Sequence, residues 1–207
     1  MELTEALRRR RMVRRYDPDR PVPVAAVEAV LAAALRAPSA GFTQGVSLLV
    51  LDTPPAREAF WAATALPGAD PERPSRWLAA MATAPVLVLL WTDREAYLDR
   101  YAEPDKGWSD RDPERWSAPY WFVDAGMAAM AALLAAVDVG LGACFFGVPA
   151  ERSDAVRAAF GVPRDQLSVG VLSLGHPAPD DRPGGSAARR GRRPAEELVH
   201  RDRWSVS

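Results

Sequence analysis

The apolar segment from Tyr120 to Val139 constrains the fold most, because its pattern predicts one long helix that is apolar on nearly every side. Alanine, leucine and methionine dominate it. A helix without a polar face has to lie at the centre of a protein or in a contact between subunits. Asp138 and several glycines interrupt the longer apolar stretch Gly126–Pro149, which favours a buried helix followed by a buried strand over a membrane span.

The rest of the chain alternates predicted strands with predicted helices, and the connections between them are uneven in length. We therefore expect an α+β layer fold and not a strictly doubly wound sheet. No repeat or domain boundary is visible, so residues 1–207 are expected to form a single domain. The predicted strands are Ser47–Thr53, Pro85–Asp93, Ala143–Val148 and Leu167–Gly175, and the further predicted helices are a short one capped by Thr4, Val24–Ala37, Ala56–Ala65 and Arg152–Phe160.

Residues 97–121 differ in kind from the rest of the chain. Charged residues are mixed there with tyrosine and tryptophan, and no helical or strand period is visible. A long irregular stretch inside a compact domain is more often a functional loop than a passive connection. We expect this segment to be a lid or part of a substrate pocket.

The composition excludes several classes of function. The only histidines are His176 and His200, and no Gly-x-Ser-x-Gly, P-loop or Gly-x-Gly-x-x-Gly motif is present, so triad hydrolases and common nucleotide-binding motifs are disfavoured. With one cysteine, Cys144, no metal site is expected and no intrachain disulfide can form, which fits a cytoplasmic protein. A net charge of −1 gives no overall field for nucleic acid.

Arginine is the remaining residue type that indicates a binding site. The stretch RRRRMVRRY holds six arginines between Arg8 and Tyr16, and a second cluster, ARRGRRP, runs from Ala188 to Pro194. The planar guanidinium group matches phosphate oxygens in pairs and stays charged at any relevant pH. If the two ends of the chain meet, the clusters would form one anion pocket. Two solvated basic patches would give the same composition, so charge alone leaves both interpretations open.

Four stretches, in this order and covering most of the chain, resemble the FMN-dependent nitroreductase family. They are RRMVRRYDPDRPVP followed by APSAGFTQ, then VDAGMAAMAALLAAVDVGLGAC, then FGVP with SVGVLSLGHP, and finally RRGRRPAEELVH. The resemblance implies an α+β three-layer fold with a central mixed, mainly antiparallel sheet flanked by helices. It also implies a homodimer that holds FMN in a groove at the subunit interface.

The resemblance assigns FMN binding to specific positions. The basic residues at both ends of the chain would hold the FMN phosphate, the turn after Pro38 would run beside the ring and ribityl chain, and a glycine N–H would approach the ring. The positions that match are Arg10, Arg11, Met12, Arg14, Ser39, Phe42, Thr43, Gln44, Gly147, Arg190 and Arg192.

Three positions depart from the family pattern. Met12 stands where the family usually has serine, and Phe42 stands where it usually has an asparagine that can hydrogen-bond the flavin. Phe146 replaces the acidic residue that some members carry before the flavin-facing glycine. A phenylalanine after Ser-x-Gly also resembles the flavin-destroying dimethylbenzimidazole synthases of the same superfamily.

The expected activity is that of an FMN oxidoreductase, which passes hydride from NAD(P)H to a small acceptor such as a nitroaromatic or a quinone by a ping-pong mechanism. Flavin N5 carries the chemistry, so no catalytic side chain is assigned. Neither a nucleic-acid nor a membrane partner is expected. The alternatives are a specialised FMN dehydrogenase or deazaflavin-linked enzyme, and a non-catalytic flavin-binding or flavin-sensing protein. The aromatic candidates for the substrate pocket are Trp108, Trp116, Tyr120 and Trp121.

Overall fold

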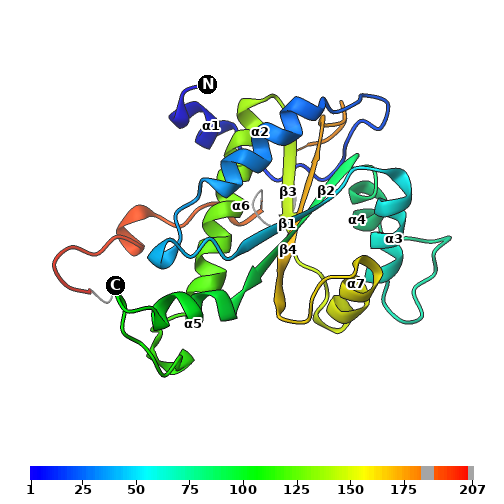
Figure 1. The fold of residues 1–207 in the computed structure, drawn as a ribbon. Helices are drawn as coiled ribbons and strands as arrows, with labels where there is room; N and C mark the ends of the chain where they lie inside the picture. Colours follow the sequence, from blue (N-terminus) through cyan, green and yellow to red (C-terminus); the bar gives the residue numbers. More distant parts are fainter. Residues whose placement is uncertain (183–188, 205–207) are drawn as a thin grey trace.

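A four-stranded sheet in the order β1-β2-β4-β3 forms the centre of the computed structural model, which describes residues 1–182 and 189–204 (Figure 1). All three strand pairs are antiparallel. The parallel component of the expected mixed sheet is one isolated bridge, between Met12 and Ala143. The α+β prediction is confirmed. The strands are β1 (Val46–Leu51), β2 (Val86–Asp93), β3 (Gly142–Phe146) and β4 (Gln166–Gly175).

Helices cover both faces of this sheet, so the molecule has three layers. Figure 1 shows α2 and α6 on one side and α3, α4 and α7 on the other. Two shorter helices, α1 and α5, lie at the periphery of the α2–α6 side. The helices are α1 (Leu3–Arg9), α2 (Val24–Leu35), α3 (Pro54–Thr64), α4 (Arg76–Met81), α5 (Arg94–Ala102), α6 (Tyr120–Asp138) and α7 (Ser153–Phe160).

Strand β2 supplies side chains to both hydrophobic cores. Val86, Val88 and Leu90 face the core that α2 and α6 close. Leu87 and Leu89 point the other way, into the core that holds residues of α3 and α7. Successive residues of a strand point to opposite faces, and a strand buried on both faces therefore has a continuous apolar sequence. This explains why PVLVLLW was readily predicted as a strand.

Helix α6 lies against α2 and the sheet through small side chains, mainly alanine, that allow close approach. It is long and apolar enough to cross a membrane by length and composition alone, a property that buried core helices share. Its other side carries a row of apolar residues that the described part of the chain leaves partly exposed. This α6 face consists of Phe122, Val123, Met127 and Met130.

The structure corrects the sequence predictions in three places. Residues 94–102 form helix α5, so the segment expected to be irregular from residue 97 begins only after this helix. Asp93 caps α5 by accepting a hydrogen bond from the Ala96 N–H at 3.2 Å. Thr4 does not cap α1, because the helix starts at Leu3 and Glu2, two residues before Thr4, occupies the cap position. Helix α4 was not predicted. The second basic cluster begins at Ala188, which lies outside the described residues.

Candidate functional site

The basic residues after α1 form a short extended segment alongside β3. Met12 bridges Ala143 in parallel, and the Val13 N–H donates to the Ala143 carbonyl at 2.9 Å. Tyr16 anchors the far end of the segment, and its buried hydroxyl donates to the Val13 carbonyl at 2.8 Å. Burial raises the pKa of the Tyr16 phenol well above its usual value, so the hydroxyl remains a hydrogen-bond donor at any ordinary pH.

The odd-numbered arginines of this segment are neutralised by acidic residues beyond β4. The guanidinium group of Arg11 pairs with the carboxylate of Asp181. The same carboxylate accepts hydrogen bonds from the backbone N–H groups of Arg14, at 3.3 Å, and Arg15, at 3.1 Å. Arg15 also pairs with Asp180 at 3.0 Å. Asp181 therefore fixes the backbone of the segment as well as one of its side chains.

The even-numbered arginines have no such partner. Within the described residues, the Arg10 guanidinium makes no ion pair, and Arg14 reaches only the Met12 carbonyl, at 3.5 Å. Met12 lies between these two arginines in the chain, and the Phe145 N–H lies 3.5 Å from its sulfur. The segment therefore leaves two guanidinium groups available to an anion.

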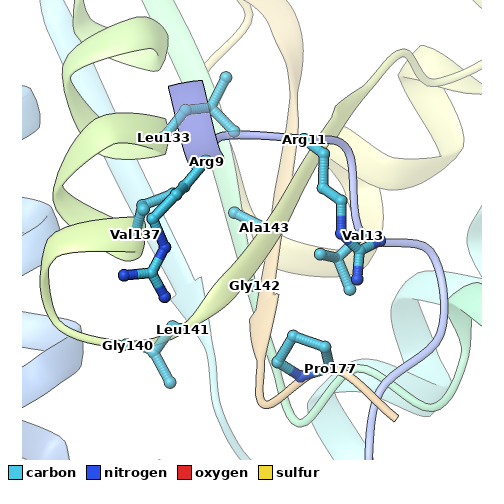
Figure 2. A pocket seen from close by; sticks show the side chains of 10 residues that line it. All are labelled: Arg9, Arg11, Val13, Leu133, Val137, Gly140, Leu141, Gly142, Ala143 and Pro177. Atoms are coloured by element: carbon cyan, nitrogen blue, oxygen red, sulfur yellow. The ribbon is translucent and has the colours of Figure 1, made fainter. Parts of the chain in front are cut away.

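A cavity of about 270 Å³ lies beside the segment, between α1, β3 and the end of α6 (Figure 2). Arg9 and Arg11 both project toward it, and Leu133 and Val137 form an apolar wall. Arg11 thus lines this cavity with its charge already balanced by Asp181. Its predicted role in FMN binding stays a prediction, and its surroundings differ from those of Arg10 and Arg14.

The turn after α2, residues 39–45, holds the second group of predicted site residues in an unusual backbone conformation. Gly41, Phe42 and Gln44 have φ values of 62°, 58° and 56°. For residues other than glycine, this left-handed region costs on the order of 1–3 kcal/mol each and persists only where the surroundings enforce it. The Ser39 hydroxyl accepts the Gln44 N–H at 2.9 Å and so closes the turn. The Phe42 side chain is 76% exposed.

Contacts from α5 and α6 hold this turn in place. The Ala40 N–H donates to the Asp124 carboxylate at 2.7 Å, and the Arg100 side chain donates to the Gly41 carbonyl at 2.9 Å. A Cβ at Gly41 would lie only 2.8 Å from the ring of Tyr101. The turn is therefore packed directly on the helix that follows β2.

Gly45→Ala is expected to lower the free energy of unfolding by ~1–3 kcal/mol, the usual cost of overpacking. The added Cβ would lie 2.5 Å from a ring carbon of Tyr97 and 3.3 Å from the Asp93 carbonyl oxygen. Urea denaturation measures the change. Gly147→Ala is the matched control, because a Cβ there meets nothing within 4 Å and should leave stability unchanged. Equal stability of the two variants would contradict the close packing at Gly45.

The four predicted pocket residues come together in one aromatic cluster centred on Trp116. Its ring centroid lies 4.3 Å from that of Tyr101, 5.3 Å from Trp108, 5.5 Å from Tyr120 and 6.3 Å from Trp121. Ion pairs fasten the same segment to α5, where Arg111 bonds Glu95 and Asp99. The role of the four aromatic residues toward a substrate stays a prediction.

Gly147 follows β3 at an exposed position, with open space where a side chain would stand. The preceding Phe146 packs into a second aromatic cluster and stacks on Trp61, with centroids 5.9 Å apart and planes 8° apart. The C-terminal residues Arg190 and Arg192 are exposed. Among the described residues, no hydrogen bond or ion pair joins them to the segment beside β3, and Figure 1 shows the tail extending away from α1.

Two carboxylates that organise the site were not predicted from the sequence. Asp181 follows proline and alanine beyond β4, and nothing in that local pattern indicates contact with Arg11. Asp124 offered a weak signal, because it is an acidic residue inside an apolar helix whose only other acidic residue, Asp138, lies at the helix end. A charge at such a position is seldom fully buried unless it has hydrogen-bond partners, and Asp124 is buried.

The fold and the basic segment define an α+β protein with cationic side chains presented beside the last strand of its sheet. Residues 7–176 match the model of the nitroreductase family, and the chain belongs to this family of oxidoreductases. The family prediction and the assignment as an enzyme are confirmed.

Similar proteins include a "NADH dehydrogenase" of Thermus thermophilus, 30% identical over 88% of this chain and 90% of its own length. A "Putative NADH dehydrogenase/NAD(P)H nitroreductase" of Methanothermobacter thermautotrophicus is 28% identical over 86% of this chain and 78% of its own. A solved structure from Desulfovibrio desulfuricans, a "putative nitroreductase in complex with FMN", is 25% identical, with a TM-score of 0.70 over 99% of each chain.

Proposed function

We propose that this chain is an FMN-dependent oxidoreductase that transfers hydride from NAD(P)H to a small oxidised acceptor such as a nitroaromatic or a quinone. One observation carries the proposal. Arg10 and Arg14 belong to the extended segment that bridges β3 at Met12, and neither forms an ion pair with a described carboxylate. The family and the names of the relatives support the same class of reaction.

The chemistry of these donors fits the phosphate of FMN. Two guanidinium groups supply paired N–H donors and positive charge, which phosphate oxygens accept well. Met12 between them contributes no hydroxyl, so the arginines have to provide the side-chain contacts. Gly147 leaves room for a flat group to approach the backbone after β3. The flavin, when bound, supplies the redox chemistry.

The remaining residues act by binding, orienting and excluding water. The turn at residues 39–45 would border the ring and ribityl chain, with Phe42 and Gln44 presented by its strained backbone. Donor and acceptor would occupy the same place in succession, which corresponds to ping-pong kinetics. The cluster around Trp116 would form an apolar wall and keep water from the reacting atoms.

We also propose that two copies of the chain form the working enzyme. The α6 face leaves Phe122, Val123, Met127 and Met130 between 37% and 43% exposed on one helix, an arrangement typical of a subunit contact. Within one chain, no hydrogen bond or ion pair between described residues joins the turn at residues 39–45 to the segment beside β3. A second copy would bring the turn of one chain to the arginines of the other.

We also propose a cytoplasmic location, because a chain with one cysteine forms no intrachain disulfide and therefore suits a reducing compartment. That cysteine, Cys144, is buried in β3. Burial raises the pKa of its thiol, which keeps the thiol protonated and unreactive.

The purified protein is expected to be yellow and to release equimolar FMN on heating. Under anaerobic conditions, NADH or NADPH should bleach the flavin band, and menadione or a nitroaromatic should restore it. A colourless protein that also refuses added FMN would contradict the proposal. Bleaching by a reduced deazaflavin and not by NAD(P)H would identify the deazaflavin-linked alternative, and full flavin occupancy without turnover would indicate a flavin-binding protein.

A further inference from the structure

We propose that Asp124 is a positioning residue for the reaction, because its carboxylate fixes the turn at residues 39–45 from inside the protein. The inference rests on the proposed function only for the identity of the ligand that the turn borders. The contacts that hold the turn do not depend on that function.

The Asp124 carboxylate joins three elements through one oxygen. It projects from α6 and is 2% exposed. Its Oδ2 accepts the Ala40 N–H at 2.7 Å and the Tyr97 hydroxyl at 2.8 Å. The fully buried Tyr97 belongs to α5. The turn, α5 and α6 therefore meet at a single acceptor atom.

Tyr97 keeps its proton and so remains a donor to this carboxylate. Burial is the larger cause and the neighbouring carboxylate the second, and both raise the pKa of the phenol well above its usual value. The ring of Tyr97 also lies against Gly45, where even a methyl group would clash. One tyrosine thus supports the turn through packing and through Asp124.

The fold gains little from a carboxylate at this position. Among the described residues, Asp124 Oδ1 has no hydrogen-bond partner, and no cation pairs with the group. A buried carboxylate that is only partly satisfied disfavours folding, and an apolar residue would suit α6 better. What the carboxylate does provide is an acceptor for the Ala40 N–H in a strained turn.

The position of the turn's outward residues depends on that acceptor. Phe42 and Gln44 are exposed and have left-handed backbone conformations. Because both side chains are exposed, the backbone conformation of the turn determines where they lie. Without an acceptor for the Ala40 N–H, the turn can relax toward ordinary backbone angles, which moves both side chains relative to the flavin.

The test compares Asp124→Leu, which removes the acceptor, with Asp124→Asn, whose amide oxygen can accept the same two hydrogen bonds. In the leucine variant we expect hydride transfer from NAD(P)H to slow by about tenfold to hundredfold, as for an ångström-scale misplacement. The asparagine variant should restore most of the rate. Single-turnover bleaching of the flavin measures both, and FMN titration separates slow transfer from weak binding.

A second readout does not depend on flavin. Amide hydrogen exchange of the flavin-free protein should show loss of protection at Ala40 and Gln44 in Asp124→Leu and retention in Asp124→Asn. If the parent protein binds no FMN, the proposed function falls, and this measurement still decides the role of Asp124.

Thr53→Ala is the matched control, because it removes the side-chain acceptor of the Ala56 N–H at the start of α3, away from the turn. It should leave hydride transfer and the protection of the turn unchanged. If Asp124→Leu does not fold, Asp124→Ala takes its place in both measurements. Parental exchange and parental rate in the acceptor-free variant would overturn the proposal. So would an asparagine variant that behaves like the leucine variant.

Discussion

The double variant Arg14→Ala/Arg192→Ala is expected to purify without FMN. Each charge-assisted contact to a phosphate contributes roughly 1.5–3 kcal/mol, so each single variant should lose about tenfold or more in affinity. If the two contacts are independent, the double variant should lose on the order of hundredfold or more. Arg14 has no carboxylate partner among the described residues, so its loss removes contacts to the ligand and little else.

Quenching of FMN fluorescence on titration measures the affinities. Arg8→Ala is the control, because the Arg8 guanidinium is exposed and donates to Glu5 at 2.8 and 2.9 Å, one helical turn away. Its loss removes a positive charge close to the segment without touching the phosphate site. Unchanged affinity in both Arg14→Ala and Arg192→Ala would place the phosphate elsewhere, and the cavity lined by Arg9 and Arg11 would then be the first place to look.

The variant Met127→Asp/Met130→Asp is expected to be a monomer. Both side chains are 37% exposed on the α6 face, so the charged residues remain in water in a single chain. In a subunit contact the same carboxylates would be buried without partners, which costs several kcal/mol. Light scattering after size-exclusion chromatography measures the mass. FMN content should fall with the dimer, because the site would lack the turn from the second copy.

Leu66→Asp is the control for this variant. Leu66 is an exposed apolar residue after α3, on the opposite side of the sheet, and its replacement should leave the mass unchanged. A dimer that survives both substitutions on α6 would show that the α6 face serves another purpose.

The parts of the fold that sequence predicts well are those in which one local pattern decides the structure. Strand β2 and helix α6 are continuous apolar runs of different length, and both were predicted nearly to the residue. Helix α5 was missed because REAYLDRYA places only Tyr97 and Leu98 in the core. A short helix held by capping and aromatic contacts does not produce a clear apolar period.

The same difference between local patterns and long-range contacts applies to the site. The arginines stand out in the sequence because they are clustered, but clustering does not show which of them pair with a carboxylate. Asp181 follows Arg11 by 170 residues, and only the folded chain brings the two together. The buried role of Asp124 likewise depends on a turn and on a helix that are distant in sequence.

The extended segment beside β3 has a further consequence for the handling of the protein. It covers the outer edge of the sheet, where unpaired N–H and C=O groups would otherwise offer a template for other chains. The same segment carries Arg10 and Arg14, and an anion bound by both would help to hold the segment in place beside β3. Loss of the ligand should therefore loosen the cover and promote aggregation, so that FMN in the purification buffer acts as a chemical chaperone.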